Sequence, residues 1–106
     1  MQSNNFVGAI YKVVGRFYSA VEPFDTNSEV RIEFNKRGYD GVLIESQRAG
    51  ELQWVLLGYD AYSPYIDSRP PLTPDMAEVR EYRVRYIKRD EPVGEWSDII
   101  SVSTMP

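Results

Sequence analysis

The chain has 106 residues, enough for one domain with an ordinary hydrophobic core and too few for two. Its formal net charge of −4 argues against nucleic acid as a partner, which requires a basic surface, and against binding to anionic membranes. It contains neither cysteine nor histidine, so it lacks disulfides, the commonest zinc, copper and iron ligands, and any Ser-His or Cys-His nucleophile pair. We therefore expect no metal, no cofactor and no catalytic residues.

We also expect neither a membrane span nor a secretory signal. No apolar run approaches the length of about 18 residues that indicates a transmembrane helix, and the first residues lack the basic region of a secretory signal. These observations favour the cytoplasm but leave the compartment open. Residues 1–9 are expected to be a frayed end or a linker to a single domain that spans 1–106.

The segment 6–22 admits two interpretations. Its apolar residues fit a helical stripe, but Gly8 and Gly15 are poor helix residues. The same residues suit a strand over about 10–21 that is bent or bulged at Gly15, and we favour this strand. Pro23 and the polar segment 25–28 then predict a turn.

The next segments predict a series of antiparallel strands. Residues 29–35 alternate cleanly, with Val30, Ile32 and Phe34 on one face. Strands at 42–46 and 52–57 are joined by a short turn and should be antiparallel neighbours, with Trp54 and Leu56 on one face of the second. Four prolines between 58 and 74 predict loops around a short extended piece at 64–67.

The last part of the chain carries the strongest pattern. Residues 81–87 alternate strictly, with Tyr82, Val84 and Tyr86 on one face and Arg83 and Arg85 on the other. A polar turn and residues 94–103 complete a hairpin. Short strands separated by turns every eight to twelve residues or so are typical of a sandwich. The sequence therefore predicts an all-β, antiparallel β-sandwich of about seven strands.

With these strands placed, residues 30–104 resemble a fibronectin type III domain, which is an immunoglobulin-like sandwich. Leu72 followed by the run Tyr82-Arg-Val-Arg-Tyr86 is similar to the tyrosine corner of that fold, and Gly94-Glu-Trp-Ser-Asp98 is similar to its final hairpin. Phe34 stands where type III domains commonly have Trp. The pieces 35–42, 63–67, 80–83 and 94–98 are more narrowly similar to a C-terminal module of uncharacterised bacterial proteins. The resemblance implies a fold and no activity.

Several residues are candidates for structural roles. We expect the hydroxyl of Tyr82 to cap a neighbouring backbone group, and Trp96 to pack over the end of the sandwich. The basic residues from Arg80 to Arg89 alternate with acids, which indicates ion pairs on a solvated face more than an anion site. The aspartates beside loops, Asp67 among them, are interpreted as turn residues, because calcium-loop spacing is absent.

Tyr59, Tyr62 and Tyr65, together with Pro64, form an aromatic cluster in a predicted loop. The rings could bind a partner, or Tyr65 and Tyr59 could fold back onto the core. We expect a non-catalytic module for protein–protein interaction or domain spacing, whose partner is another protein or domain bound at this loop or at an adjacent sheet edge. The alternative is a small carbohydrate-binding module that uses the same loop. An enzyme with paired carboxylates would need a cleft that so small a domain rarely offers.

Overall fold

The structure, a computed structural model, describes residues 10–17 and 28–104. Every regular element among them is a β-strand, and these residues include no helix that could cross a membrane. The prediction of an all-β chain is therefore confirmed. The turn expected after Pro23 and the frayed or linking start at 1–9 lie outside the described residues.

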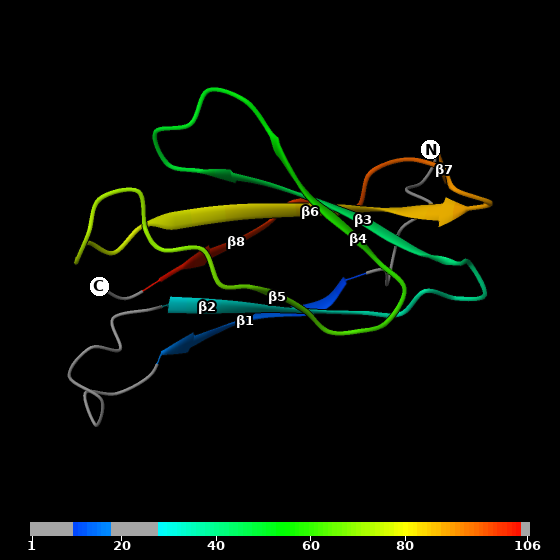
Figure 1. Ribbon diagram of the computed structural model, residues 1–106, viewed down its shortest axis with the longest axis horizontal. Coiled ribbons are helices and arrows are strands. Elements are labelled where there is room, and N and C mark those ends of the chain that lie inside the picture. Colours follow the sequence, from blue (N-terminus) through cyan, green and yellow to red (C-terminus); the bar gives the residue numbers. More distant parts are fainter. Residues whose placement is uncertain (1–9, 18–27, 105–106) are drawn as a thin grey trace.

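The strands form two antiparallel sheets that lie one over the other (Figure 1). The first sheet has the order β1 (Ile10–Phe17), β2 (Ser28–Phe34) and β5 (Tyr65–Asp67). The second has the order β4 (Val55–Asp60), β3 (Gly41–Arg48) and β6 (Val79–Lys88), followed by β7 (Glu91–Val93) and β8 (Ile100–Ser103). β4 and β5 are therefore edge strands, each of a different sheet.

β7 and β8 are two parts of one edge position. Because β3 pairs with one side of β6, β7 and β8 both pair with its other side, β7 with residues 86–88 and β8 with residues 79–82. Ser97 bridges the interruption: its backbone N–H donates to the carbonyl of Val84, and its hydroxyl accepts from the N–H of Val84. Eight segments thus occupy seven strand positions, in agreement with the expected number.

β1 settles the ambiguity of the segment 6–22 over the residues that are described. Residues 10–17 are a strand paired with β2, as we favoured. The prediction of a bend or bulge at Gly15 was wrong, because Gly15 pairs in register with Val30. The register shift of this strand pair lies between Ile10 and Lys12 instead. Residues 18–21 of the predicted strand lie outside the described part of the chain.

The core lies between the sheets and is built by the alternation that the sequence predicted. β2 supplies it from the first sheet, and β3 and β6 supply it from the second. Its buried members are Val30, Ile32, Phe34, Val42, Ile44, Tyr82, Val84 and Tyr86. Each such apolar side chain contributes about 1.5–3 kcal/mol when it leaves water, so this cluster is the main source of stability.

The chain passes closely over the start of β3 where it leaves β4. A Cβ atom at Gly41 would lie 2.5 Å from the carbonyl oxygen of Asp60 and 3.0 Å from the Cα of Ala61. Both neighbours are backbone atoms, which cannot rotate away as a flexible side chain does. The connection after β4 can therefore lie this close to β3 only because residue 41 is a glycine and has no side chain.

We predict that Gly41→Ala lowers the free energy of unfolding by about 1–3 kcal/mol, because the backbone at 60–61 must move to accept the methyl group. Denaturant unfolding measures the effect, with Lys88→Ala at an exposed strand end as the control. Equal midpoints and slopes for the Gly41→Ala variant and the native chain would contradict the prediction.

Candidate functional site

The structure separates the three tyrosines that the sequence grouped. Tyr65 lies on β5, packs against the core and donates its hydroxyl to the carbonyl of Leu57 at 3.3 Å. Tyr59 lies on β4 opposite Leu43 and is half exposed. Tyr62 is 75% exposed, with the ammonium group of Lys36 4.6 Å from its ring centroid. Tyr65 thus folds back onto the core, whereas Tyr59 and Tyr62 remain at the surface.

A stack of aromatic rings and cations covers the outer face of the second sheet. The guanidinium of Arg83 lies 4.2 Å from the ring centroids of both Trp54 and Trp96. Arg83 also pairs with Glu45, directly opposite on β3, at 2.6 Å, and Arg85 donates to the carbonyl of Gly94. Cation–π contacts of this kind stabilise by about 0.5–2 kcal/mol. These contacts hold the arginine side chains against the sheet. The ion pairing that the sequence predicted on this face is observed for Arg83.

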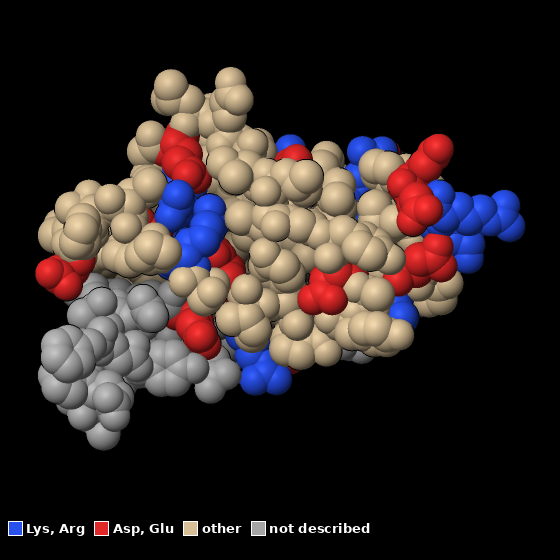
Figure 2. Space-filling view, in the orientation of Figure 1, with Lys and Arg blue, Asp and Glu red and all other residues tan. Residues whose placement is uncertain are grey.

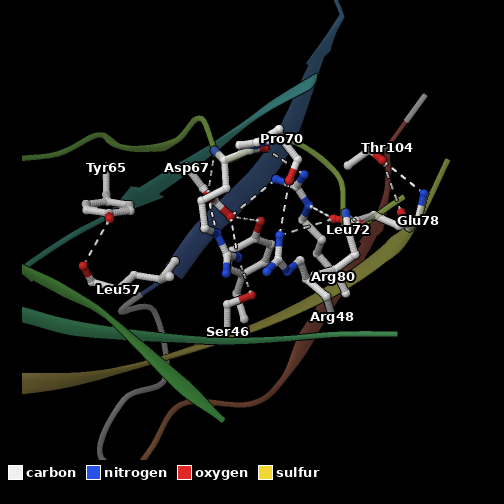
Figure 3. A network of polar contacts seen from close by, with 12 residues as sticks. Ser46, Arg48, Leu57, Tyr65, Asp67, Pro70, Leu72, Glu78, Arg80 and Thr104 are labelled. Atoms are coloured by element: carbon white, nitrogen blue, oxygen red, sulfur yellow. Dashed lines mark hydrogen bonds and ion pairs between the residues drawn. The ribbon is translucent and has the colours of Figure 1, made fainter. Parts of the chain in front are cut away.

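A buried carboxylate joins the two sheets. Asp67 ends β5 and is 2% exposed, because it shares the inward face with Tyr65 two residues before it. Arg69 donates to its two oxygens, at 2.8 Å each (Figure 3). The hydroxyl of Tyr82, on β6 in the other sheet, donates to Oδ2 at 2.6 Å, and Arg80 Nη1 lies 3.4 Å from the same oxygen. One carboxylate of the first sheet is therefore the common partner of two side chains from the second sheet and one from the connection between them.

The network extends from this carboxylate into the long connection before β6. Arg80 is fully buried and donates to Glu78 at 2.7 Å and to the carbonyl of Arg69 at 2.9 Å. Glu78 in turn accepts from the N–H of Leu72 at 2.9 Å, and its backbone carbonyl accepts from the N–H of Thr104. Arg48 reaches the carbonyl of Pro70 at 3.1 Å (Figure 3). The connection 68–78 is thereby attached to the body of the domain at several points.

The charges in this network control the ionisation of its members. Burial by itself raises the pKa of Asp67, but the hydrogen bonds from Arg69 and Tyr82 and the positive charges of Arg69 and Arg80 leave that pKa below its ordinary value. Burial, together with the neighbouring Asp67 carboxylate, raises the pKa of Tyr82 far above its ordinary value. At neutral pH the carboxylate is therefore ionised and the phenol is a neutral donor.

These contacts revise several sequence interpretations. Asp67 does accept from the N–H of Arg69 two residues on, as a turn-forming Asp does, but it is also buried. Arg80 is buried and not on a solvated face. The hydroxyl of Tyr82 is satisfied by a side chain and not by a backbone group. Leu72, assigned to the same corner, is 49% exposed and lines a surface groove of about 350 Å³. The carboxylate of Asp67 takes the place of the backbone acceptor that was expected for the hydroxyl of Tyr82, and Leu72 is not a core residue.

Phe34 is a core member, as expected. Trp96 is half buried, but it lies in the stack with Arg83 on the outer face of the second sheet and not over the end of the sandwich, where it was expected. The sequence did not single out Arg69, and it gave Trp54 no role beyond a place on one strand face. It assigned Arg80 to a solvated face, although the alternation of 80–86 places Arg80 on the inward face. Within the described residues, no cluster of three or more acidic side chains is arranged to hold a metal ion.

Comparison with protein-family models finds no match, and no curated protein or solved structure matches the chain. Any function must therefore be argued from the residues themselves.

We predict that Tyr82→Phe lowers the free energy of unfolding by about 1–3 kcal/mol, because Asp67 loses a short hydrogen bond in a site that water cannot refill. Denaturant titration measures the loss, and Tyr62→Phe at the exposed ring serves as the matched control. An unchanged midpoint with an unchanged slope for Tyr82→Phe would show that the hydroxyl is dispensable.

The domain should also lose stability in acid through Asp67. Its pKa is lower in the folded state than in the unfolded chain, so its contribution is complete above the unfolded value of about 4 and is lost as the pH falls through the folded value. We expect the free energy of unfolding to fall more steeply below about pH 4 for the native chain than for Asp67→Asn, which cannot titrate. Parallel profiles for the two proteins would contradict this assignment.

Proposed function

We propose that the chain is a fibronectin-III-like, immunoglobulin-like module without catalytic activity, which acts in protein–protein interaction or as a spacer between domains. The strands can be lettered as in an immunoglobulin-like sandwich. β1 and β2 are then A and B, β3 and β4 are C and C′, β5 and β6 are E and F, and β7 and β8 together are G. With these letters the two sheets are A-B-E and C′-C-F-G. This is the arrangement that the sequence resemblance implies, and it supports the fold assignment.

A binding role is favoured over catalysis by the state of the charged residues. The buried carboxylate of Asp67 is neutralised by Arg69 and Arg80, and Glu45 is paired with Arg83. These acids are occupied by arginines of the same chain. Their arrangement indicates a structural use, because a general acid or base must reach a substrate.

One observation carries the interaction proposal: exposed apolar side chains gather around β4. Five of the eleven large hydrophobic side chains that are exposed in the described part of the chain lie within residues 52–62. They are Leu52, Val55, Leu56, Tyr59 and Tyr62. Figure 2 shows mostly uncharged side chains over the middle of this face, with charged ones gathered towards its two ends. Exposed apolar side chains gathered in one part of a protein surface mark a contact surface.

The carbohydrate-binding alternative has less support. A sugar platform needs rings that face the ligand together, and Tyr65 is packed against the core while Tyr59 and Tyr62 lie in separate surroundings. The proposed partner is therefore a protein, and the proposed contact surface is β4 with its flanking residues.

A photo-crosslinking residue placed at Leu56 or Tyr62 should give a discrete protein adduct in the native host, whereas the same residue at Ile99, exposed elsewhere, should not. Tyr62→Ala should weaken the captured interaction by more than about 1 kcal/mol and change the free energy of unfolding by less than about 0.5 kcal/mol.

Equal adducts at all three positions, or specific retention on a glycan array without any protein adduct, would overturn the interaction proposal. Unfolding of the Tyr62→Ala variant would place that ring in the core and remove it from the contact surface.

A further inference from the structure

The four sheet edges of the domain differ in how they are protected. An unpaired strand edge invites another strand, and monomeric proteins block it with charges, prolines or short strands. β1 carries Lys12 and Arg16, β5 has three residues and ends in Asp67, and β7 contains Pro92. β8 has four residues and lies beside β1.

β4 lacks charges and prolines over most of its length, and its one irregularity is the extra residue Leu57 in its pairing with β3. From Val55 to Tyr59 it contains neither a charge nor a proline, and residues 52–54 before it are also uncharged. It ends its sheet in the described part of the structure, and Figure 1 shows it at the front of the molecule, open to the viewer. The edge without charges or prolines over most of its length is thus also the one around which exposed apolar side chains gather.

We propose that β4 pairs antiparallel with β4 of a second copy of this chain, so that the two outer sheets continue into one. This inference rests on the proposed function and names the partner at the same surface. Two identical edges meet across a two-fold axis, so every contact is made twice by one strand. The partner strand is a second β4 because the apolar residues of β4 can lie opposite one another when two copies of this strand pair.

A bulge at Leu57 decides how β4 can pair with its copy. Leu56 pairs with Glu45 and Tyr59 with Leu43 on β3. Because Glu45 and Leu43 are two residues apart, Leu56 and Tyr59 share the outer face although they are three residues apart. A two-fold axis between Leu57 and Gly58 places Leu56 opposite Tyr59 of the second copy. An axis through Leu57 would instead oppose Val55 and Tyr59, which lie on different faces.

This register covers the exposed side chains and avoids opposing like charges. The half-exposed Leu56 and Tyr59 become aliphatic–aromatic cross-strand pairs, a favourable combination. Asp60, the charged end of the strand, comes opposite Val55. Lys36, which lies over the ring of Tyr62, comes near the turn of the second copy that holds Glu51, whose carboxylate is already paired with Arg48 of its own chain. Because one strand pair covers a small area, we expect a weak, concentration-dependent dimer.

Sedimentation equilibrium up to about 1 mM tests the association. The native chain should dimerise, and Leu56→Glu should raise the dimer dissociation constant by at least about tenfold, because a carboxylate is forced against Tyr59 of the second copy. Ile99→Glu, an exposed apolar residue outside β4, is the matched control and should dimerise as the native chain does. Circular dichroism verifies folding, and Tyr59→Lys replaces Leu56→Glu if the latter unfolds.

Cysteine pairing tests the register, since the native chain has no cysteine. Residues directly opposite have Cβ atoms about 4.5–5.5 Å apart, near disulfide range. A mixture of Leu56→Cys and Tyr59→Cys should therefore form the mixed disulfide dimer. Leu56→Cys alone should not, because two copies of residue 56 are offset by about 10 Å along the strands.

A native chain that is monomeric at about 1 mM, equal effects of Leu56→Glu and Ile99→Glu, or no preference for the mixed disulfide would overturn the homodimer. If the chain is monomeric but the crosslinker at Leu56 still captures a different protein, the homodimer is wrong and the proposed function stands. If the chain is monomeric and the crosslinker at Leu56 captures no protein, both the homodimer and the proposed interaction function are wrong.

Discussion

The buried carboxylate of Asp67 is the interaction on which the rest of the structure depends. An ionised carboxyl group inside a protein is costly unless it is paired and hydrogen-bonded. Here Arg80 and Tyr82 on β6 and Arg69 in the connection before it supply that compensation. Each partner is in turn needed by the others, because removal of one leaves a charge or donor buried without its complement. The packing of β5 against β6 is thus determined by charge as well as by apolar contact.

This arrangement has a consequence for the long connection 68–78. Such a proline-containing segment has few apolar contacts with which to hold itself. Glu78 fixes it by accepting from Leu72 and Arg80, and Arg48 fixes it through Pro70. One end of the sandwich is therefore ordered by polar contacts, while the core between the sheets is ordered by burial of β-branched and aromatic side chains.

β4 takes little part in either source of stability. Leu57 packs against the core, but Leu56 and Tyr59 point away from it. The stack of Trp54, Arg83 and Trp96 holds the neighbouring surface in place on the same sheet. A surface whose side chains are already ordered loses less entropy on binding, so a rigid outer face next to an open edge suits an interaction surface.

Period-two alternation was sufficient to predict the strands at 29–35 and 81–87, the inward faces of both, and hence most of the core. Alternation is a local property: it follows from the geometry of one strand and needs no partner. For the same reason it predicted that Tyr82 is inward without revealing what its hydroxyl binds. The acceptor, Asp67, lies 15 residues earlier on a strand of the other sheet.

The sequence by itself thus determined the β architecture, the approximate strands and the apolar faces. Only the tertiary structure decided which charges are buried, because Arg80 belongs in water unless Asp67 and Glu78 approach it together. It also decided which of the rings of Tyr59, Tyr62 and Tyr65 is buried, since the pairing of β4 with β3 and of β5 with β2 sets which ring faces the core. Compensation of a buried charge and the register of an edge strand arise between segments distant in the chain, which no local pattern records.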